Sequence, residues 1–182
     1  MIEYAMRSNY YTYIISSVLC LALTVAIAYS ADAVPWRVLK IVDGDSLIVA
    51  PVRGSARTGR REEVRLIGID APEIGQRPWG RKAKKHLQTL IGKSGRLELE
   101  LDIERHDRYG RLLAYAWASN GLFINERMVA DGYALACTIP PNVKYAGRIA
   151  AAQKKARQQR AGLWRHHAFE ISPQKWRRDH PR

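Results

Sequence analysis

The chain has 182 residues and a formal net charge of +13 at pH 7. This length suits one ordinary domain and is too short for two substantial ones. The excess of positive charge favours a polyanionic partner such as nucleic acid, with a basic surface that only aids solubility as the alternative.

The first 33 residues have the pattern of an export signal. An apolar run at 13–28 follows Arg7 and precedes "ADA" at 31–33, a small-x-small sequence of the kind that signal peptidase cleaves. We therefore expect residues 1–33 to be a signal peptide and the protein to be secreted or periplasmic. An uncleaved N-terminal membrane anchor is the alternative. Cleavage would leave Cys137 as the one cysteine, which excludes an internal disulfide.

Three strands are predicted next. The β-rich segments 36–42 and 46–50 are joined by Asp43-Gly44, a dipeptide typical of tight hairpin turns. The segment 51–63 is rich in Gly, Ser and Arg and predicts a basic loop. The third strand is predicted at 64–69.

Periodicity then predicts two further strands and three helices. At 96–103, Leu and Ile alternate with acidic residues as a half-buried antiparallel strand requires, which places Ile103 on the buried face. At 77–91, an apolar stripe lies opposite Lys and Arg, as in an amphipathic helix. The remaining elements are a strand at 111–118 and helices at 123–132 and 143–160.

This order of elements predicts an α+β fold, a five-stranded OB-fold β-barrel with three α-helices. The strands are not regularly separated by crossover helices, which disfavours a parallel sheet. We place this domain at 34–165. The segment 166–182 has no periodicity, so we expect a basic, flexible tail there.

Three short motifs carry the residues best suited to chemistry. Asp45 and Asp70 supply hard anionic oxygens with no soft ligand nearby, which suits Ca²⁺ or Mg²⁺ and favours Ca²⁺, with the carbonyl of Ala71 as a further ligand. The alternative is that the two aspartates only flank a turn or cap a helix. The motifs are "VDGDS" (42–46), "RLIGIDAPE" (65–73) and "DRYGR" (107–111).

The same motifs supply two arginines and a third carboxylate. The planar guanidinium groups of Arg65 and Arg111 can each hold phosphate oxygens at two points while charge builds during phosphodiester hydrolysis. Glu73 is then available to orient or deprotonate the attacking water. Arg65 and Asp70 are five residues apart and would point to opposite faces of a regular strand, so we expect a bulge or sharp bend at Gly68.

These motifs resemble those of the staphylococcal (micrococcal) nuclease family. The matching segments are "IVDGDS", "VRLIGIDAPE", "DRYGR" and the closing "GLW", in the family's order between Trp36 and Trp164. The resemblance implies a five-stranded barrel with three helices. It also implies calcium-dependent cleavage of DNA and RNA, nonspecific for the sugar, that leaves 3′-phosphates.

The resemblance also implies a role for individual residues. It assigns Ca²⁺ binding to Asp45, Asp70 and the carbonyl of Ala71, catalysis to Arg65, Glu73 and Arg111, and substrate contacts to Arg108 and Tyr109.

The sequence thus predicts an exported calcium-dependent nuclease that acts on DNA and RNA as a monomer without a stable protein partner. Contact with a membrane is expected only through an uncleaved N-terminal segment. A non-catalytic OB-fold module that binds nucleic acid is the main alternative, because barrels of this kind often bind without cleaving. Retention of the full set of acids and arginines favours the nuclease.

Overall fold

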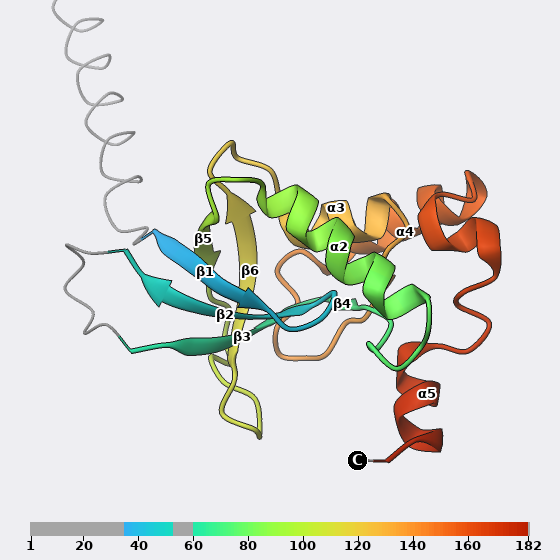
Figure 1. The fold of residues 1–182 in the computed structure, drawn as a ribbon, viewed down its shortest axis with the longest axis horizontal. Helices are drawn as coiled ribbons and strands as arrows, with labels where there is room; N and C mark the ends of the chain where they lie inside the picture. The colour runs from blue at the N-terminus through green and yellow to red at the C-terminus, as the bar shows by residue number, and fades with distance from the viewer. Residues whose placement is uncertain (1–34, 53–59, 182) are drawn as a thin grey trace, which may run out of the picture. The chain divides into compact units, whose positions relative to one another are not determined.

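The computed structural model describes residues 35–52 and 60–181, so the expected leader and most of the basic loop lie outside the described residues (Figure 1). In chain order the elements are β1 (Trp36–Ile41), β2 (Ser46–Pro51), β3 (Glu62–Leu66), β4 (Ile69–Asp70), α2 (Trp79–Ile91), β5 (Arg96–Glu100), β6 (Leu112–Ala118), α3 (Ile124–Ala130), β7 (Leu135–Ala136), α4 (Ala146–Gln158), the 3₁₀ helix η1 (Gly162–His166) and α5 (Pro173–Asp179).

Five strands close into a barrel in the order β1-β2-β3-β6-β5. The barrel closes where β5 pairs with β1, with Trp36 opposite Leu97. Strands β3 and β6 are parallel and the other barrel pairs are antiparallel. The short strands β4 and β7 form a separate two-stranded sheet. The predicted α+β fold with a five-stranded barrel is confirmed.

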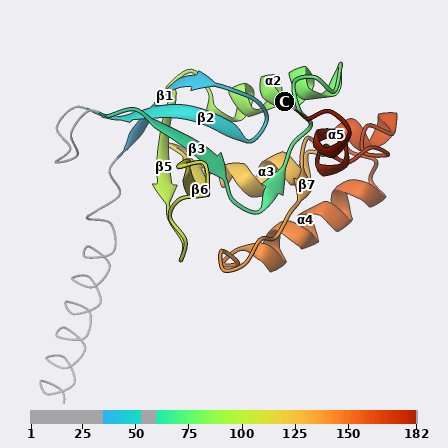
Figure 2. The same ribbon diagram turned by 90° about the horizontal axis from the view of Figure 1, so that it is seen from below.

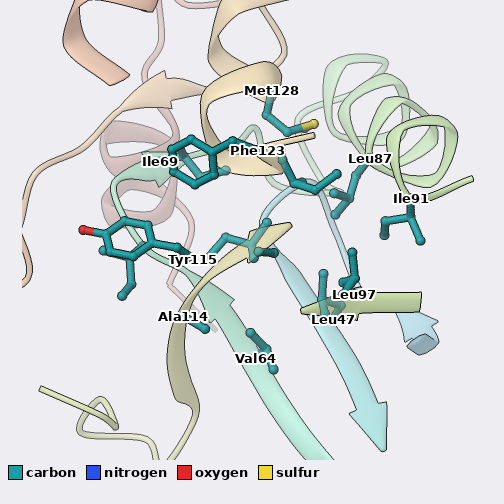
Figure 3. Packing of buried hydrophobic residues seen from close by; sticks show 14 of the residues in the cluster. Leu47, Val64, Ile69, Leu87, Ile91, Leu97, Ala114, Tyr115, Phe123 and Met128 are labelled. Carbon is teal, nitrogen blue, oxygen red and sulfur yellow. The ribbon is translucent and has the colours of Figure 1, made fainter. Parts of the chain in front are cut away.

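The barrel core follows from the alternation of side chains along each strand. Leu47, Val64 and Leu97 are fully buried and point into the barrel from β2, β3 and β5. Leu87 and Ile91, on the apolar stripe of α2, pack toward them (Figure 3). The apolar stripe predicted for this helix therefore forms the face that covers the barrel core.

One strand ends earlier than its sequence pattern predicts. Strand β5 stops at Glu100, and Ile103 is 72% exposed rather than buried. The backbone N–H and carbonyl of Glu104 pair with the side chain of Asn142, at 2.8 Å each, instead of with a neighbouring strand. The alternating pattern was wrong for these last residues, where the backbone N–H of Ile103 donates to the side chain of Asp102 at 3.0 Å rather than to a strand.

A fourth helix lies in the segment that the sequence predicts to be a tail. Helix α5 begins after Ser172, whose hydroxyl accepts a hydrogen bond from the Lys175 backbone at 3.2 Å, and Pro173 occupies its first turn. The described residues thus hold four α-helices rather than three, and the expectation of no regular element after residue 166 was wrong. Serine before proline is a helix-start signal that the sequence did contain.

In the part of the chain that the structure describes, no helix is long and apolar enough to cross a bilayer. The expected signal peptide or anchor at 1–33 lies outside the described residues and stays a prediction, as does the domain boundary at 165.

Candidate active site

Asp45 and Asp70 meet at the guanidinium group of Arg65. Strand pairing sets Ser46 opposite Arg65, which brings Asp45 beside the end of β3. One Arg65 nitrogen, Nη2, lies 3.2 Å from Asp45 Oδ2 and 3.2 Å from Asp70 Oδ1. The two carboxylate oxygens are therefore separated by no more than twice that distance, and in this structure one cationic group, the Arg65 guanidinium, contacts both.

The predicted bend at Gly68 is confirmed and explains how Arg65 reaches Asp70. Strand β3 ends at Leu66, Gly68 has a φ of +78°, and β4 starts at Ile69. A positive φ is easily adopted by glycine and is strained for most other residues. The bend breaks the alternation of side chains, so Asp70 turns toward Arg65 rather than away from it.

Asn125 of α3 fixes this bend from the inside and was not foreseen. Its fully buried amide donates to the carbonyl of Ile67 at 2.8 Å and accepts from the backbone of Ala116 in β6 at 2.9 Å. It therefore joins the bend to the barrel wall. A polar residue on the inner face of an apolar helix was the available sequence signal, because a buried amide needs hydrogen-bond partners.

Both aspartates are almost completely buried, with 5% of Asp45 and 4% of Asp70 exposed. Asp45 is oriented by the backbone N–H of Ala71, at 2.7 Å from Oδ2, and by the hydroxyl of Ser46, at 3.0 Å from Oδ1. Burial raises the pKa of Asp70, and a hydrogen bond from Arg177 is the largest opposing influence. The acids are thus held in fixed positions where an added positive charge is favourable.

A third aspartate, Asp43, adds to the same crowded negative charge. Its Oδ1 accepts a hydrogen bond from the backbone of Asp45 at 2.9 Å. Burial, followed by the negative charge of Asp45, raises its pKa to about 7. The sequence placed Asp43 only in a turn, whereas the structure makes it part of the surroundings of Asp45.

Gly44 allows three elements to converge beneath the acids. A Cβ added at Gly44 would lie 2.6 Å from the Cβ of Ala71 and 2.8 Å from the Cβ of Ala83 in α2. The β1–β2 turn, the segment after β4 and helix α2 therefore touch at a point where only hydrogen fits. Close contact at this point fixes the spacing between Asp45 and Ala71.

The carboxylates of Asp45 and Asp70 and the carbonyl of Ala71 suit a hard divalent cation bound at an open site. Within residues 35–52 and 60–181, no group of three or more His, Cys, Asp and Glu side chains is arranged to hold a metal. Two carboxylates and a backbone carbonyl leave several of the six to eight positions of Ca²⁺ for water and substrate. In this structure the same carboxylates attract guanidinium cations, as expected of a cation site.

Glu73 lies in the loop that follows β4. Its backbone N–H donates to Gln76 Oε1 at 3.0 Å, and its carbonyl accepts from the Gln76 backbone at 2.9 Å. Gly80, at the start of α2, packs directly on that carbonyl. These contacts fix the backbone of Glu73. Its carboxylate is 14% exposed and binds Arg177, which also binds Asp70.

Arg177 of α5 is the residue that sequence reasoning missed entirely. It donates to both oxygens of Asp70, at 3.0 Å each, and to Glu73 Oε1 at 2.8 Å. No local pattern identifies it, because more than a hundred residues separate it from Asp70.

Arg111 is held inside its own loop. Asp107 Oδ1 accepts from the backbones of Tyr109 and Arg111, at 2.9 and 3.0 Å, and Oδ2 binds the Arg111 guanidinium at 2.7 Å. Burial pushes the pKa of Asp107 upward, but the hydrogen bonds from Arg111 and Tyr109 outweigh it and hold the pKa below its usual value. Asp107 therefore stays ionised and keeps Arg111 in place.

The barrel places this loop next to Arg65. Arg65 pairs with Leu113 across the parallel β3–β6 ladder, and Arg111 precedes Leu113 by two residues. Their neighbours Val64 and Leu112 are buried inside the barrel. Since side chains alternate along strands, Arg65 of β3 points out of the barrel, and Arg111 lies in the loop immediately before the adjacent strand β6.

Arg108 and Tyr109 form the exposed tip of the loop. Tyr109 is 69% exposed, and Arg108 Nη2 donates to its hydroxyl at 2.6 Å. The Tyr109 ring also lies 5.6 Å from the guanidinium carbon of Arg111. An accessible aromatic ring beside two cations is suited to contact a base and a phosphate.

The structure therefore groups the predicted site residues in two neighbouring places. Asp45, Asp70, Ala71 and Arg65 are in direct contact, with Glu73 joined to them through Arg177. Arg108, Tyr109 and Arg111 form a second group one strand away. The catalytic and ligand roles given to these residues stay predictions, because geometry alone does not establish a reaction.

Comparison with known proteins gives an independent result. Residues 63–166 match the family described as "Staphylococcal nuclease homologue". The chain is 34% identical over 144 residues to the Thermonuclease of Staphylococcus hyicus, covering 74% of this chain and 78% of that protein. It is 38% identical over 138 residues to the Thermonuclease of Staphylococcus intermedius, covering 71% and 75%. It is 31% identical over 132 residues to the Endonuclease YncB of Bacillus subtilis (strain 168), covering 69% and 59%.

Proposed function

The chain belongs to the staphylococcal nuclease family and is a nuclease, and on that premise we propose that it is an exported, calcium-dependent endonuclease. It cleaves phosphodiester bonds of DNA and RNA without regard to the sugar and leaves 3′-phosphates. The contact of Asp45 and Asp70 with one Arg65 nitrogen, at 3.2 Å each, is the observation that carries this proposal. Asp45 and Asp70 in this arrangement can together bind a cation that also contacts a phosphate of the substrate.

Each residue of the site has a distinct task. Asp45, Asp70 and the carbonyl of Ala71 would hold Ca²⁺, which when bound stabilises negative charge on the phosphate. Arg65, from β3, and Arg111, from the loop before β6, grip phosphate oxygens as that charge develops. Glu73 orients the attacking water and accepts its proton.

The exposed tip of the 107–111 loop would contact the rest of the substrate. Tyr109 offers a ring on which a base can stack, and every base has such a face, so this contact does not select a sequence. Arg108 adds positive charge for the backbone. The net charge of +13 supports the same partner, because Lys and Arg neutralise phosphates along the strand.

Export and oligomeric state rest on the sequence. The apolar run at 13–28 and the small residues at 31–33 support secretion or a periplasmic location, with retention as a membrane anchor as the alternative. We further propose that the enzyme acts as a monomer without a stable protein partner.

A cleavage assay tests the proposed function. Wild-type protein is incubated with plasmid DNA and with RNA, in Ca²⁺ and in a calcium chelator, and product ends are identified by mass spectrometry. Cleavage of both substrates in Ca²⁺ alone, with 3′-phosphate ends, is expected. Full activity in chelator, or no activity in Ca²⁺, would contradict the proposal.

The variant Glu73→Gln separates catalysis from binding in the same assay. It removes the proton acceptor and keeps the size of the side chain, so the cleavage rate should fall by about 100-fold or more while DNA binding persists. A rate within threefold of wild type would show that Glu73 is not the base. The proposal of cleavage would survive that result, because other assignments of the base remain open.

A further inference from the structure

Helix α5 brings a positive charge into the proposed calcium site. The Arg177 guanidinium donates to both oxygens of Asp70, at 3.0 Å each, and to Glu73 Oε1 at 2.8 Å. It therefore contacts a proposed metal ligand and the proposed base at the same time. Neither oxygen of Asp70 is left without a guanidinium hydrogen bond.

Neutral contacts fasten the same segment to the loop that carries Glu73. The buried amide of Gln76 donates to the carbonyl of Ile171 at 3.1 Å, just before α5 begins. The indole of Trp176 lies on Gly75, where an added Cβ would be 2.5 Å from its Cη2 atom. Helix α5 is drawn in red near the C-terminus, close to this loop, in both ribbon views (Figures 1 and 2). Its position is thus built from packing and a hydrogen bond as well as from the ion pairs.

Arg177 and a divalent cation place competing demands on Asp70. Asp70 already contacts Arg65 on one side, and Arg177 adds a second guanidinium group. A divalent cation bound to Asp70 would lie within a few ångströms of the Arg177 charge, at which distance like charges repel strongly in a poorly solvated site. A guanidinium group is not deprotonated in proteins, so Arg177 keeps its positive charge beside a bound cation.

We propose that α5 is an autoinhibitory segment in which Arg177 takes the place of the divalent cation at Asp70 and blocks Glu73. This inference rests on the proposed function, because it assumes that Asp70 is a metal ligand. Docking of α5 and binding of Ca²⁺ then oppose each other, and each weakens the other by the same factor. The active state has α5 displaced from the loop, with the ion pair between Arg177 and Glu73 broken.

Calcium binding by the full chain gives a readout that does not depend on catalysis. Isothermal titration calorimetry with Ca²⁺ compares wild type, Arg177→Gln and Arg178→Gln. Arg178 is the matched control, because it lies on the same helix, its side chain is 75% exposed and its ion pair, with Asp179, is long at 4.0 Å. We expect Arg177→Gln to bind Ca²⁺ about tenfold more tightly than wild type and Arg178→Gln to stay within twofold of wild type.

Hydrogen exchange on the wild-type protein provides a second test that needs no variant. The backbone amides of Trp176 and His180 donate to the carbonyls of Ser172 and Trp176 in the docked helix. If Ca²⁺ displaces α5, exchange in peptides spanning 172–180 should become faster when Ca²⁺ is added. Slower or unchanged exchange there would overturn the inference.

The possible results separate this inference from the proposed function. Equal Ca²⁺ affinity in wild type and Arg177→Gln would overturn autoinhibition and leave calcium-dependent cleavage standing. Weaker Ca²⁺ binding in Arg177→Gln would also overturn it and make Arg177 a supporting part of the site. If both variants bound Ca²⁺ more tightly by the same factor, the loss of one positive charge would explain the change, and autoinhibition would be overturned. No Ca²⁺ binding by any of the three proteins would overturn the inference together with the proposed calcium site.

Discussion

The acid centre and the 107–111 loop hold their charged side chains in opposite ways. In the acid centre, Asp45 from the β1–β2 turn, Arg65 from β3 and Asp70 from β4 meet through the barrel ladder and the bend at Gly68. In the loop, Asp107 organises Arg111 from four residues away, with hydrogen bonds that need no other element. One group is placed by tertiary structure and the other by its own local geometry.

This difference predicts which substitutions disturb the fold. A change that shifts the acid centre alters contacts between the β1–β2 turn, the segment after β4 and helix α2, so stability and cation binding should fall together. A change in the loop removes a charge or a ring from a surface turn, so activity should fall while stability is kept. Substitutions at Arg111, Gly44 and Tyr109 test the two sides of that contrast.

Arg111→Ala should give the largest loss of activity without loss of the fold. Asp107 keeps its two backbone hydrogen bonds, from Tyr109 and residue 111, so the turn should persist. The cleavage rate should drop by about 100-fold or more, because a group that stabilises charge in the transition state is removed. Single-turnover cleavage and thermal unfolding measure the two effects.

The control for Arg111→Ala is Arg105→Ala, an exposed arginine near the start of the same loop. It lowers the net charge equally and should change the rate by less than threefold. A much lower unfolding temperature for Arg111→Ala than for wild type would show that the order of the loop does not depend on its own residues alone, which would contradict the difference between the two regions.

Gly44→Ala should disturb the acid centre as a whole. The new Cβ would meet Ala71 at 2.6 Å and Ala83 at 2.8 Å, so the β1–β2 turn must move away from α2. We expect the free energy of unfolding to fall by about 1–3 kcal/mol, as for overpacked sites, and Ca²⁺ binding to weaken at the same time. Urea unfolding and calcium titration check both. Stability lost with calcium affinity unchanged would uncouple the turn from the metal ligands.

Tyr109→Ala should have a smaller effect, confined to substrate binding. The ring is 69% exposed and contributes little to the core. Loss of one stacking platform should raise KM by about five- to tenfold, with kcat nearly unchanged. Tyr109→Phe keeps the ring and should retain a KM near that of wild type. An equal rise in KM for both variants would assign the effect to the hydroxyl bonded to Arg108.

His86→Gln probes a region remote from both groups. Burial lowers the pKa of His86 despite its 2.8 Å contact with Asp131. The unfolded chain therefore takes up a proton at higher pH than the folded protein, so wild type loses stability as pH falls below about 6.5. Between pH 7.5 and pH 5, the unfolding free energy should fall more in wild type than in His86→Gln. If the unfolding free energy fell more in the variant than in wild type, the pKa of His86 would be raised by folding rather than lowered.

The contrast between the two regions also explains what could be predicted from sequence. The loop motif "DRYGR" contains its whole hydrogen-bond network within five residues, so its local order follows directly from the sequence. The barrel followed from the strand patterns, and the bend at Gly68 from the need to bring Arg65 and Asp70 together. These features depend on residues close in sequence or on regular alternation.

The features that escaped prediction depend on contacts across the fold. Asn142 binds the backbone of Glu104, just beyond the end of β5, from 38 residues away. Arg177 reaches Asp70 only because Trp176 and Gln76 dock α5 on the loop. No period or motif encodes such contacts, although the Ser172-Pro173 helix start could have been recognised.

A crystal structure of the wild-type protein grown with Ca²⁺ would show whether the two aspartates bind the metal. We expect one calcium ion bound by carboxylate oxygens of both Asp45 and Asp70, at about 2.3–2.6 Å, with Arg177 moved away from Asp70. A calcium ion bound elsewhere while Asp45 and Asp70 still share the Arg65 guanidinium and keep Arg177 would contradict this expectation.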